Sequence, residues 1–127
     1  WWSFPFHDTT SQKAYKLTLS VLKKKPRTKN FPLWTVPGTF KSINADKFAE
    51  WQKKAPWYKQ AELMAVLTDL VKDGNVNWLG RVGAVESLAK LGAKKAELEK
   101  LRKSFGEPKG DDVHVANALD KAIATAP

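Results

Sequence analysis

The chain contains no cysteine and only two histidines among its 127 residues. Without cysteine it has no disulfide, no thiolate nucleophile, no iron–sulfur cluster and no cysteine-type zinc site, and the redox compartment is left open. His7 and His114 lie near opposite ends of the chain, and neither has a partner at a metal-ligand spacing such as HExxH. We therefore expect no metal, no cofactor and no catalytic histidine.

Other signatures of catalysis and of membrane insertion are also missing. The sequence has neither a glycine-rich phosphate loop nor a nucleophile elbow, and its carboxylates stand at expected helix caps or beside lysines. These features favour a protein that is not an enzyme. No run of eighteen or more apolar residues occurs, so we expect no transmembrane helix and a soluble or peripheral protein.

The start of the chain bears on localisation. It begins with Trp1 and Trp2 instead of methionine, which favours a mature form from which a targeting peptide has been removed. The compartment stays unassigned, and an organelle such as a mitochondrion or a plastid is the setting that this reasoning favours.

Positive charge is abundant and unevenly distributed. The net charge is +9, and residues 1–60 hold twelve Lys and Arg against three Asp and Glu, whereas residues 61–127 hold ten of each. The whole excess therefore lies in the first half. Clustered positive charge repels itself, so it is commonly matched to an anionic partner. The alternative is a solvated, lysine-rich surface that serves solubility.

Capping residues, apolar periodicity and proline or glycine stops predict an all-α fold, a bundle of five or six helices with short connections. The expected helices cover about residues 9–25, 45–54, 57–72, 77–91 and 93–105, and a last one follows Asp111 and Asp112. Asn75 or Asn77 should cap the fourth helix, and Gly92 should end it. The helix over 57–72 has only a narrow polar strip, so we expect it to be the most buried.

Two segments depart from this helical plan. Residues 1–12 are aromatic at their start and lack a helical period, and we assign them to an extended arm attached to a single helical domain of residues 13–127. Residues 26–43 carry three prolines with aromatic residues between them, which predicts a long, extended connection.

The first helix should have one apolar and one basic side. Its expected apolar positions are Ala14, Tyr15, Leu17, Leu19, Val21 and Leu22. Lys13, Lys16, Ser20 and Lys23 recur at spacings of three and four on the other side.

Two segments of the second half, GRVGAVESLAKLG at 80–92 and VANALDKAIA at 115–124, alternate small residues with leucine along successive helices. Residues 60–124 thereby resemble HEAT-like helical repeats. The resemblance departs from the pattern because the arginine of the first segment has no counterpart in the second. What it implies is a protein-binding helical scaffold.

The glycines of the first segment have several interpretations. Gly80 and Gly83 show the GxxG spacing of a KH-domain phosphate clamp, but no strands flank them, which excludes that domain. A helix-hairpin-helix turn would need one residue fewer between the glycines. We favour a structural role, in which Gly80, Gly83 and Ala84 let another helix approach closely.

The best candidate binding site lies in the first half, where a basic cluster at 23–29 is interleaved with aromatic residues. The candidate residues are Trp1, Trp2, Phe4, Lys23, Lys24, Lys25, Arg27, Lys29, Phe31 and Trp34. This composition suits an acidic protein groove, phosphates with stacked bases, or anionic lipid headgroups. It favours a non-enzymatic accessory subunit of a larger respiratory, photosynthetic or ribosomal assembly with an acidic surface. The alternative is a protein that binds DNA or RNA through the cluster at 23–29.

Overall fold

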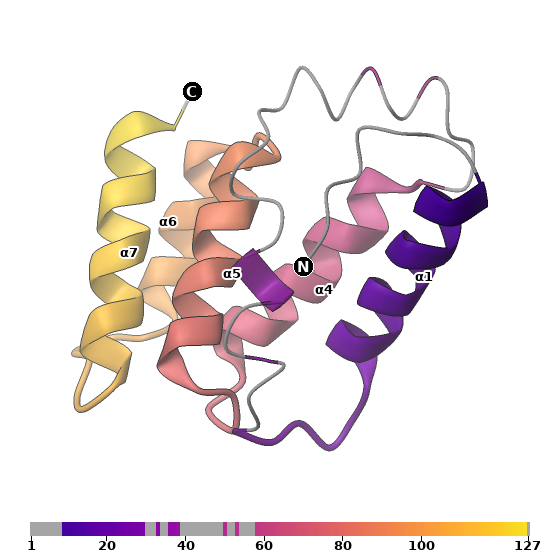
Figure 1. The fold of residues 1–127 in the computed structure, drawn as a ribbon. Helices are drawn as coiled ribbons and strands as arrows, with labels where there is room; N and C mark the ends of the chain where they lie inside the picture. The colour runs from indigo at the N-terminus through magenta and orange to yellow at the C-terminus, as the bar shows by residue number, and fades with distance from the viewer. Residues whose placement is uncertain are drawn as a thin grey trace.

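In the part of the chain that the structure, a computed structural model, describes, helices are joined by turns and irregular segments, and no strand occurs (Figure 1). The described residues are 9–29, 33, 36–38, 50, 53 and 58–126. The helices are α1 (Thr9–Lys23), α4 (Gln60–Lys72), α5 (Trp78–Lys90), α6 (Lys95–Lys103) and α7 (Asp112–Thr125). The predicted all-α class is therefore confirmed.

The last four helices form two antiparallel pairs, α4 with α5 and α6 with α7, and α5 runs parallel to α7 beside it (Figure 1). The first helix, α1, lies at the edge of this group and contacts α4. Short turns make the antiparallel pairing possible, because they return the chain along the helix that has just ended.

Local sequence signals set most of the helix ends. The side chain of Asn77 accepts a hydrogen bond from the backbone N–H of Leu79 at 2.9 Å, which caps α5 as predicted. Gly92 follows α5 with a φ of 90°, a left-handed conformation that favours glycine. Asp111 stands at the N-cap position of α7 without a side-chain capping bond. Asp112 binds an arginine of α5 instead.

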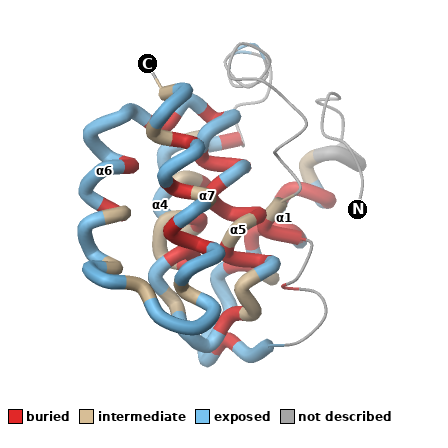
Figure 2. The backbone as a smooth tube through the Cα atoms, turned by 90° about the vertical axis from the view of Figure 1, so that its left-hand side faces the viewer, coloured by how far each residue is buried: buried red, intermediate tan, exposed pale blue. Residues whose placement is uncertain are grey.

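Helix α5, and not the helix over 57–72, is the most enclosed element. Buried positions occur around most of its circumference: Gly80, Arg81, Gly83, Ala84, Val85, Ser87 and Leu88. Helix α4 buries only Leu63, Leu67, Leu70 and Val71, whereas Ala61 and Ala65 are exposed. Figure 2 shows this contrast, with buried positions concentrated on α5 and the inner sides of its neighbours. Helix α5 is enclosed because α4 and α7 pack on it and because the backbone of Leu33, Pro37 and Gly38 approaches its glycines.

The small residues of α5 receive the long connection, and its described residues there are helical and not extended as predicted: Leu33 is α-helical and residues 36–38 form a 3₁₀ turn. A Cβ atom on Gly80 would overlap the carbonyl oxygen of Leu33, and one on Gly83 would lie 3.0 Å from the backbone nitrogen of Gly38. The hydroxyl of Ser87 donates a hydrogen bond to the carbonyl oxygen of Pro37 at 2.6 Å. The expected close approach is therefore present, and the approaching backbone is that of Leu33, Pro37 and Gly38.

One boundary and one expected burial differ from the sequence predictions in the first half. Helix α1 begins at Thr9, in line with the helix predicted over about 9–25, so residues 9–12 are helical and do not belong to the extended arm. Leu17 is 51% exposed and lies on the outer side of α1, although we expected it on the apolar side. Most of the arm and of the predicted helix 45–54 lies outside the described residues.

Candidate functional site

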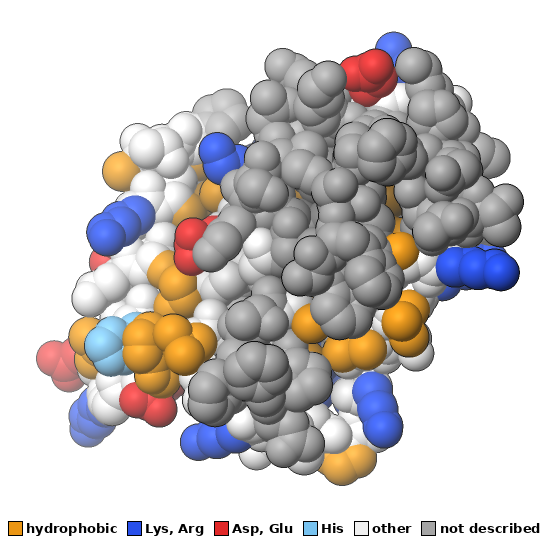
Figure 3. All heavy atoms as spheres, in the orientation of Figure 1, with side chains coloured by type: hydrophobic (Ala, Val, Ile, Leu, Met, Phe, Trp, Pro, Cys, Tyr) orange, Lys and Arg blue, Asp and Glu red, His pale blue; other side chains and the backbone are white. Residues whose placement is uncertain are grey.

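The outer side of α1 is a basic surface with one apolar residue in it. We call Lys13, Lys16, Leu17, Ser20 and Lys24 the α1 ridge, and all five side chains are exposed. Their spacing along the helix and its first following residue places them on the side away from α4. Figure 3 shows separate Lys or Arg side chains at the edge of the molecule that α1 forms, with apolar side chains between them. The helix itself contains no acidic residue, so nothing on it offsets these charges.

Arg27, by contrast, is an internal residue. Its side chain is only 2% exposed, and its Nη1 donates to Oδ2 of Asp69 at 2.8 Å and to Oδ2 of Asp73 at 3.0 Å. Its Nε donates to the carbonyl oxygen of Leu22 at 3.1 Å, in the last turn of α1. Arg27 thus joins the C-terminal end of α1 to α4, and its guanidinium is not available to a partner in this conformation.

Two lysines of the same cluster also face carboxylates of α4. Lys23 Nζ lies 3.2 Å from Oε1 of Glu62, and Lys25 Nζ lies 3.2 Å from Oδ2 of Asp69. The hydrogen bond from Arg27, together with the nearby Lys25, holds the pKa of the Asp69 carboxyl below its usual range, although partial burial works in the opposite direction. The basic cluster is therefore partly neutralised from within.

The ten predicted binding residues thus separate into groups. Lys23, Lys24, Lys25 and Lys29 are exposed, Lys23 and Lys25 also pair with carboxylates of α4, and Arg27 is buried. The aromatic candidates Trp1, Trp2, Phe4, Phe31 and Trp34 lie outside the described residues.

The spacing of the α4 carboxylates that pair with Lys23, Lys25 and Arg27 is visible in the sequence. Glu62, Asp69 and Asp73 are seven and eleven positions apart, which places them on one side of a helix. That acidic line on α4 matches the positive charges after α1. The sequence does not show that α1 and α4 lie side by side, which is what brings these charges together.

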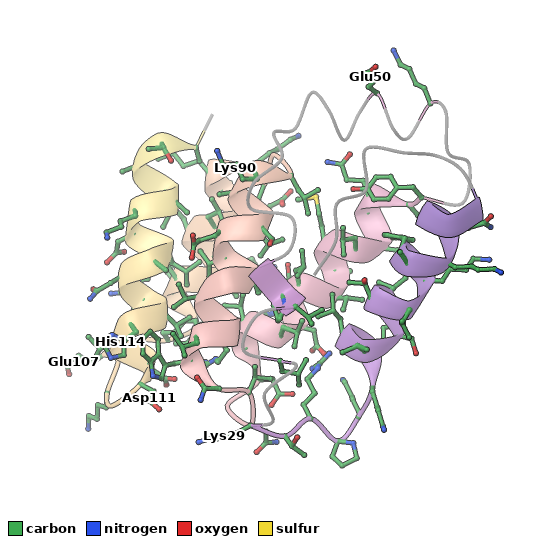
Figure 4. All side chains as sticks on the ribbon, in the orientation of Figure 1. Lys29, Glu50, Lys90, Glu107, Asp111 and His114 are labelled. Atoms are coloured by element: carbon green, nitrogen blue, oxygen red, sulfur yellow. The ribbon has the colours of Figure 1, made fainter. Side chains whose placement is uncertain are left out.

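A groove of about 630 Å³ runs between α5 and α7. At one end the rings of Trp78 and His114 stack with centroids 4.2 Å apart and planes inclined by 26°. Figure 4 places His114 near the start of α7 and Lys90 toward the other end of α5. This pair could not be predicted from the sequence, because each ring stands at the start of a different helix.

Arg81, near the start of α5, connects this helix to α4 and α7. It is 4% exposed, its Nε donates to the carbonyl oxygen of Val71 at 2.9 Å, and its Nη1 donates to Oδ1 of Asp112 at 2.7 Å. Its guanidinium also lies 5.4 Å from the ring centroid of Phe105. Arg81 therefore satisfies a carbonyl in the last turn of α4 and fixes the start of α7, which holds the groove walls in register.

Among the described residues, no cluster of His, Asp and Glu could hold a metal ion, and no described helix is long and apolar enough to cross a membrane. No protein-family model, curated protein or solved structure matches the chain. The resemblance to HEAT-like repeats therefore stays a prediction.

Proposed function

We propose that this protein is a non-enzymatic accessory subunit that docks onto an acidic surface of a larger protein assembly through the α1 ridge. The observation that carries the proposal is an edge helix whose free side combines lysines with an exposed leucine. Lys13, Lys16 and Lys24 form no ion pair within the described part of the chain. Leu17 between them is 51% exposed.

This combination supports a protein partner over a nucleic acid. Phosphate binding depends on the number of available cations, and the cluster at 23–29 has Lys23, Lys25 and Arg27 already paired with carboxylates of α4. An apolar side chain at the centre of a charged rim is the pattern of a protein interface, in which the apolar residue anchors and the lysines steer the encounter. Binding of DNA or RNA is thus the alternative that the test must separate.

The test begins with a pull-down from native extract and mass spectrometry to obtain the partner complex. Leu17→Ser should then raise the dissociation rate, because it removes the anchor, whereas Lys13→Gln, Lys16→Gln and Lys24→Gln together should mainly slow association and weaken its salt dependence. The matched control carries Lys94→Gln, Lys95→Gln and Lys100→Gln, which remove the same charge from exposed positions at or near α6. That control should leave binding unchanged.

Two results would contradict this proposal. One is the recovery of nucleic acid without a stoichiometric protein complex. The other is an equal loss of binding in the α1 and α6 triple variants, because that would mean that only the net charge matters and not its place on the molecule.

A further inference from the structure

The groove between α5 and α7 is lined at regular helical intervals by the two parallel helices. Its floor and closed end consist of Trp78, Val82, Val85, Ala89, Ala118 and Ala122. From Trp78 to Lys90 the rise of an α-helix gives a length of about 18 Å, or more than three turns. The groove is therefore long enough for more than three turns of a partner helix to lie along it.

The shape of the groove favours a broad occupant over a small molecule. The groove is open to solvent along its length, because Ala89 in its floor and Glu86 and Asn117 on its rims are all exposed. Small-molecule pockets usually enclose most of their ligand's surface, which an open groove does not do. Alanines in the floor leave room for the bulky side chains of a helix, which is how helix-in-groove recognition works.

The charges give the occupant its chemistry. Lys90 on α5 and Lys121 on α7 stand on opposite rims, and neither forms an ion pair within the described residues. Glu86 is the one acidic residue in the lining. The other end is closed by the stacked rings of Trp78 and His114. The groove therefore presents an aromatic end and an end flanked by two lysines.

We infer that this groove binds an amphipathic α-helix of a partner protein, with apolar residues on its inner face and acidic side chains placed beside Lys90 and Lys121. Bulky apolar residues of that helix pack on Val82, Ala89 and Trp78, which line the groove and are not fully buried. This site is separate from the α1 ridge, so a partner bound there leaves the ridge free.

The experiment uses the full chain as bait for a phage-displayed library of helix-forming peptides of roughly fourteen residues, long enough to follow the groove. We expect selected peptides to share apolar residues at spacings of three and four with acidic residues near one end. In fluorescence anisotropy, Ala89→Arg should weaken the best peptide by about tenfold or more, because a long charged side chain then occupies the floor.

Matched variants locate the binding. Ala65→Arg, at an exposed position of α4 outside the groove, should not change the affinity. The triple glutamine variant of the α1 ridge should bind the peptide as the wild type does, which separates this inference from the proposed function. Repeating the selection on a chain with Lys90→Glu and Lys121→Glu should enrich basic peptides in place of acidic ones. Circular dichroism confirms that each variant is folded.

Several outcomes would overturn the inference. They are a selection without enrichment, selected peptides that Ala89→Arg does not affect, and an unchanged charge preference on the doubly substituted chain. Self-association in sedimentation that Ala89→Arg abolishes would also overturn it, because the groove would then hold a second copy of this chain.

Discussion

Single buried arginines connect the helices of this protein at the points where one helix ends. The Nε of Arg27 binds a carbonyl in the last turn of α1, and the Nε of Arg81 binds one in the last turn of α4. In both, Nη1 reaches an aspartate of another helix. Such contacts satisfy carbonyls that a helix leaves without partners at its C-terminal end. They also determine the relative placement of two helices, which a surface lysine does not do.

This role makes Arg27 a stability residue. Arg27→Ala should lower the free energy of unfolding by about 2–3 kcal/mol, because it removes hydrogen bonds to two carboxylates and a carbonyl. Arg27→Lys should restore little, since an ammonium lacks the planar fork that reaches all three acceptors. Urea denaturation measures both. The control is Lys24→Ala at an exposed neighbour, for which we expect a change within about 0.5 kcal/mol. Equal effects of Arg27→Ala and Lys24→Ala would show that the arginine contacts do not stabilise the fold.

At the scale of elements, the sequence predicts the helix ends and inward positions that depend on nearby residues. The start of α5 after Asn77 and its stop at Gly92 follow from capping and from left-handed glycine geometry. The inward positions of α7 follow from periodicity. The exposure of Leu17 does not, because Leu17 fits the apolar pattern of α1 and only the placement of α4 decides which side is covered.

The candidate site shows the same division. Periodicity identifies Lys13, Lys16 and Ser20 as an outer side of α1, and the structure leaves them exposed. The burial of Arg27 could not be predicted, because a basic run looks the same in sequence whether it is solvated or paired. Its carboxylate partners stand 42 and 46 positions away along the chain, so only the tertiary fold brings them together.

Helix α5 offers a test at this scale, because its glycines make room for a neighbouring backbone. Gly80→Ala should lower the free energy of unfolding by about 1–3 kcal/mol, since the new Cβ must displace the carbonyl of Leu33. Helix propensity alone predicts a gain of about 1 kcal/mol, so the two effects differ in sign. Gly74→Ala is the control, because a Cβ there meets nothing within 4 Å. Thermal unfolding that finds Gly80→Ala more stable than the wild type would disprove the close approach.

At the scale of the whole molecule, α1 is attached to the rest through its contact with α4 and through a pair of buried tyrosines. The rings of Tyr15 on α1 and Tyr58 just before α4 meet edge to face, with centroids 5.1 Å apart. These are the only two tyrosines of the chain. Their ionisation therefore reports directly on whether α1 stays in place.

Alkaline titration is the corresponding experiment. Burial raises the pKa of Tyr15 to about 12 and also raises the pKa of Tyr58 above its usual range. In the unfolded chain both phenols ionise near pH 10. Because the folded-state pKa is the higher one, the tyrosines' contribution to stability is fully present below about pH 10 and is lost as the pH rises toward the folded-state value.

We therefore expect tyrosinate absorbance to remain low through pH 10 in the native protein and to rise at higher pH together with the loss of helical circular dichroism. The chain in concentrated urea should titrate near pH 10 without such a delay. Tyr15→Phe removes one of the two ionisations that favour the unfolded chain. Once its stability at neutral pH is taken into account, the variant should therefore unfold at a higher pH than the wild type. A native titration that already reaches half of its tyrosinate signal near pH 10, with circular dichroism unchanged, would mean that the two rings are accessible to solvent and do not hold α1 in place.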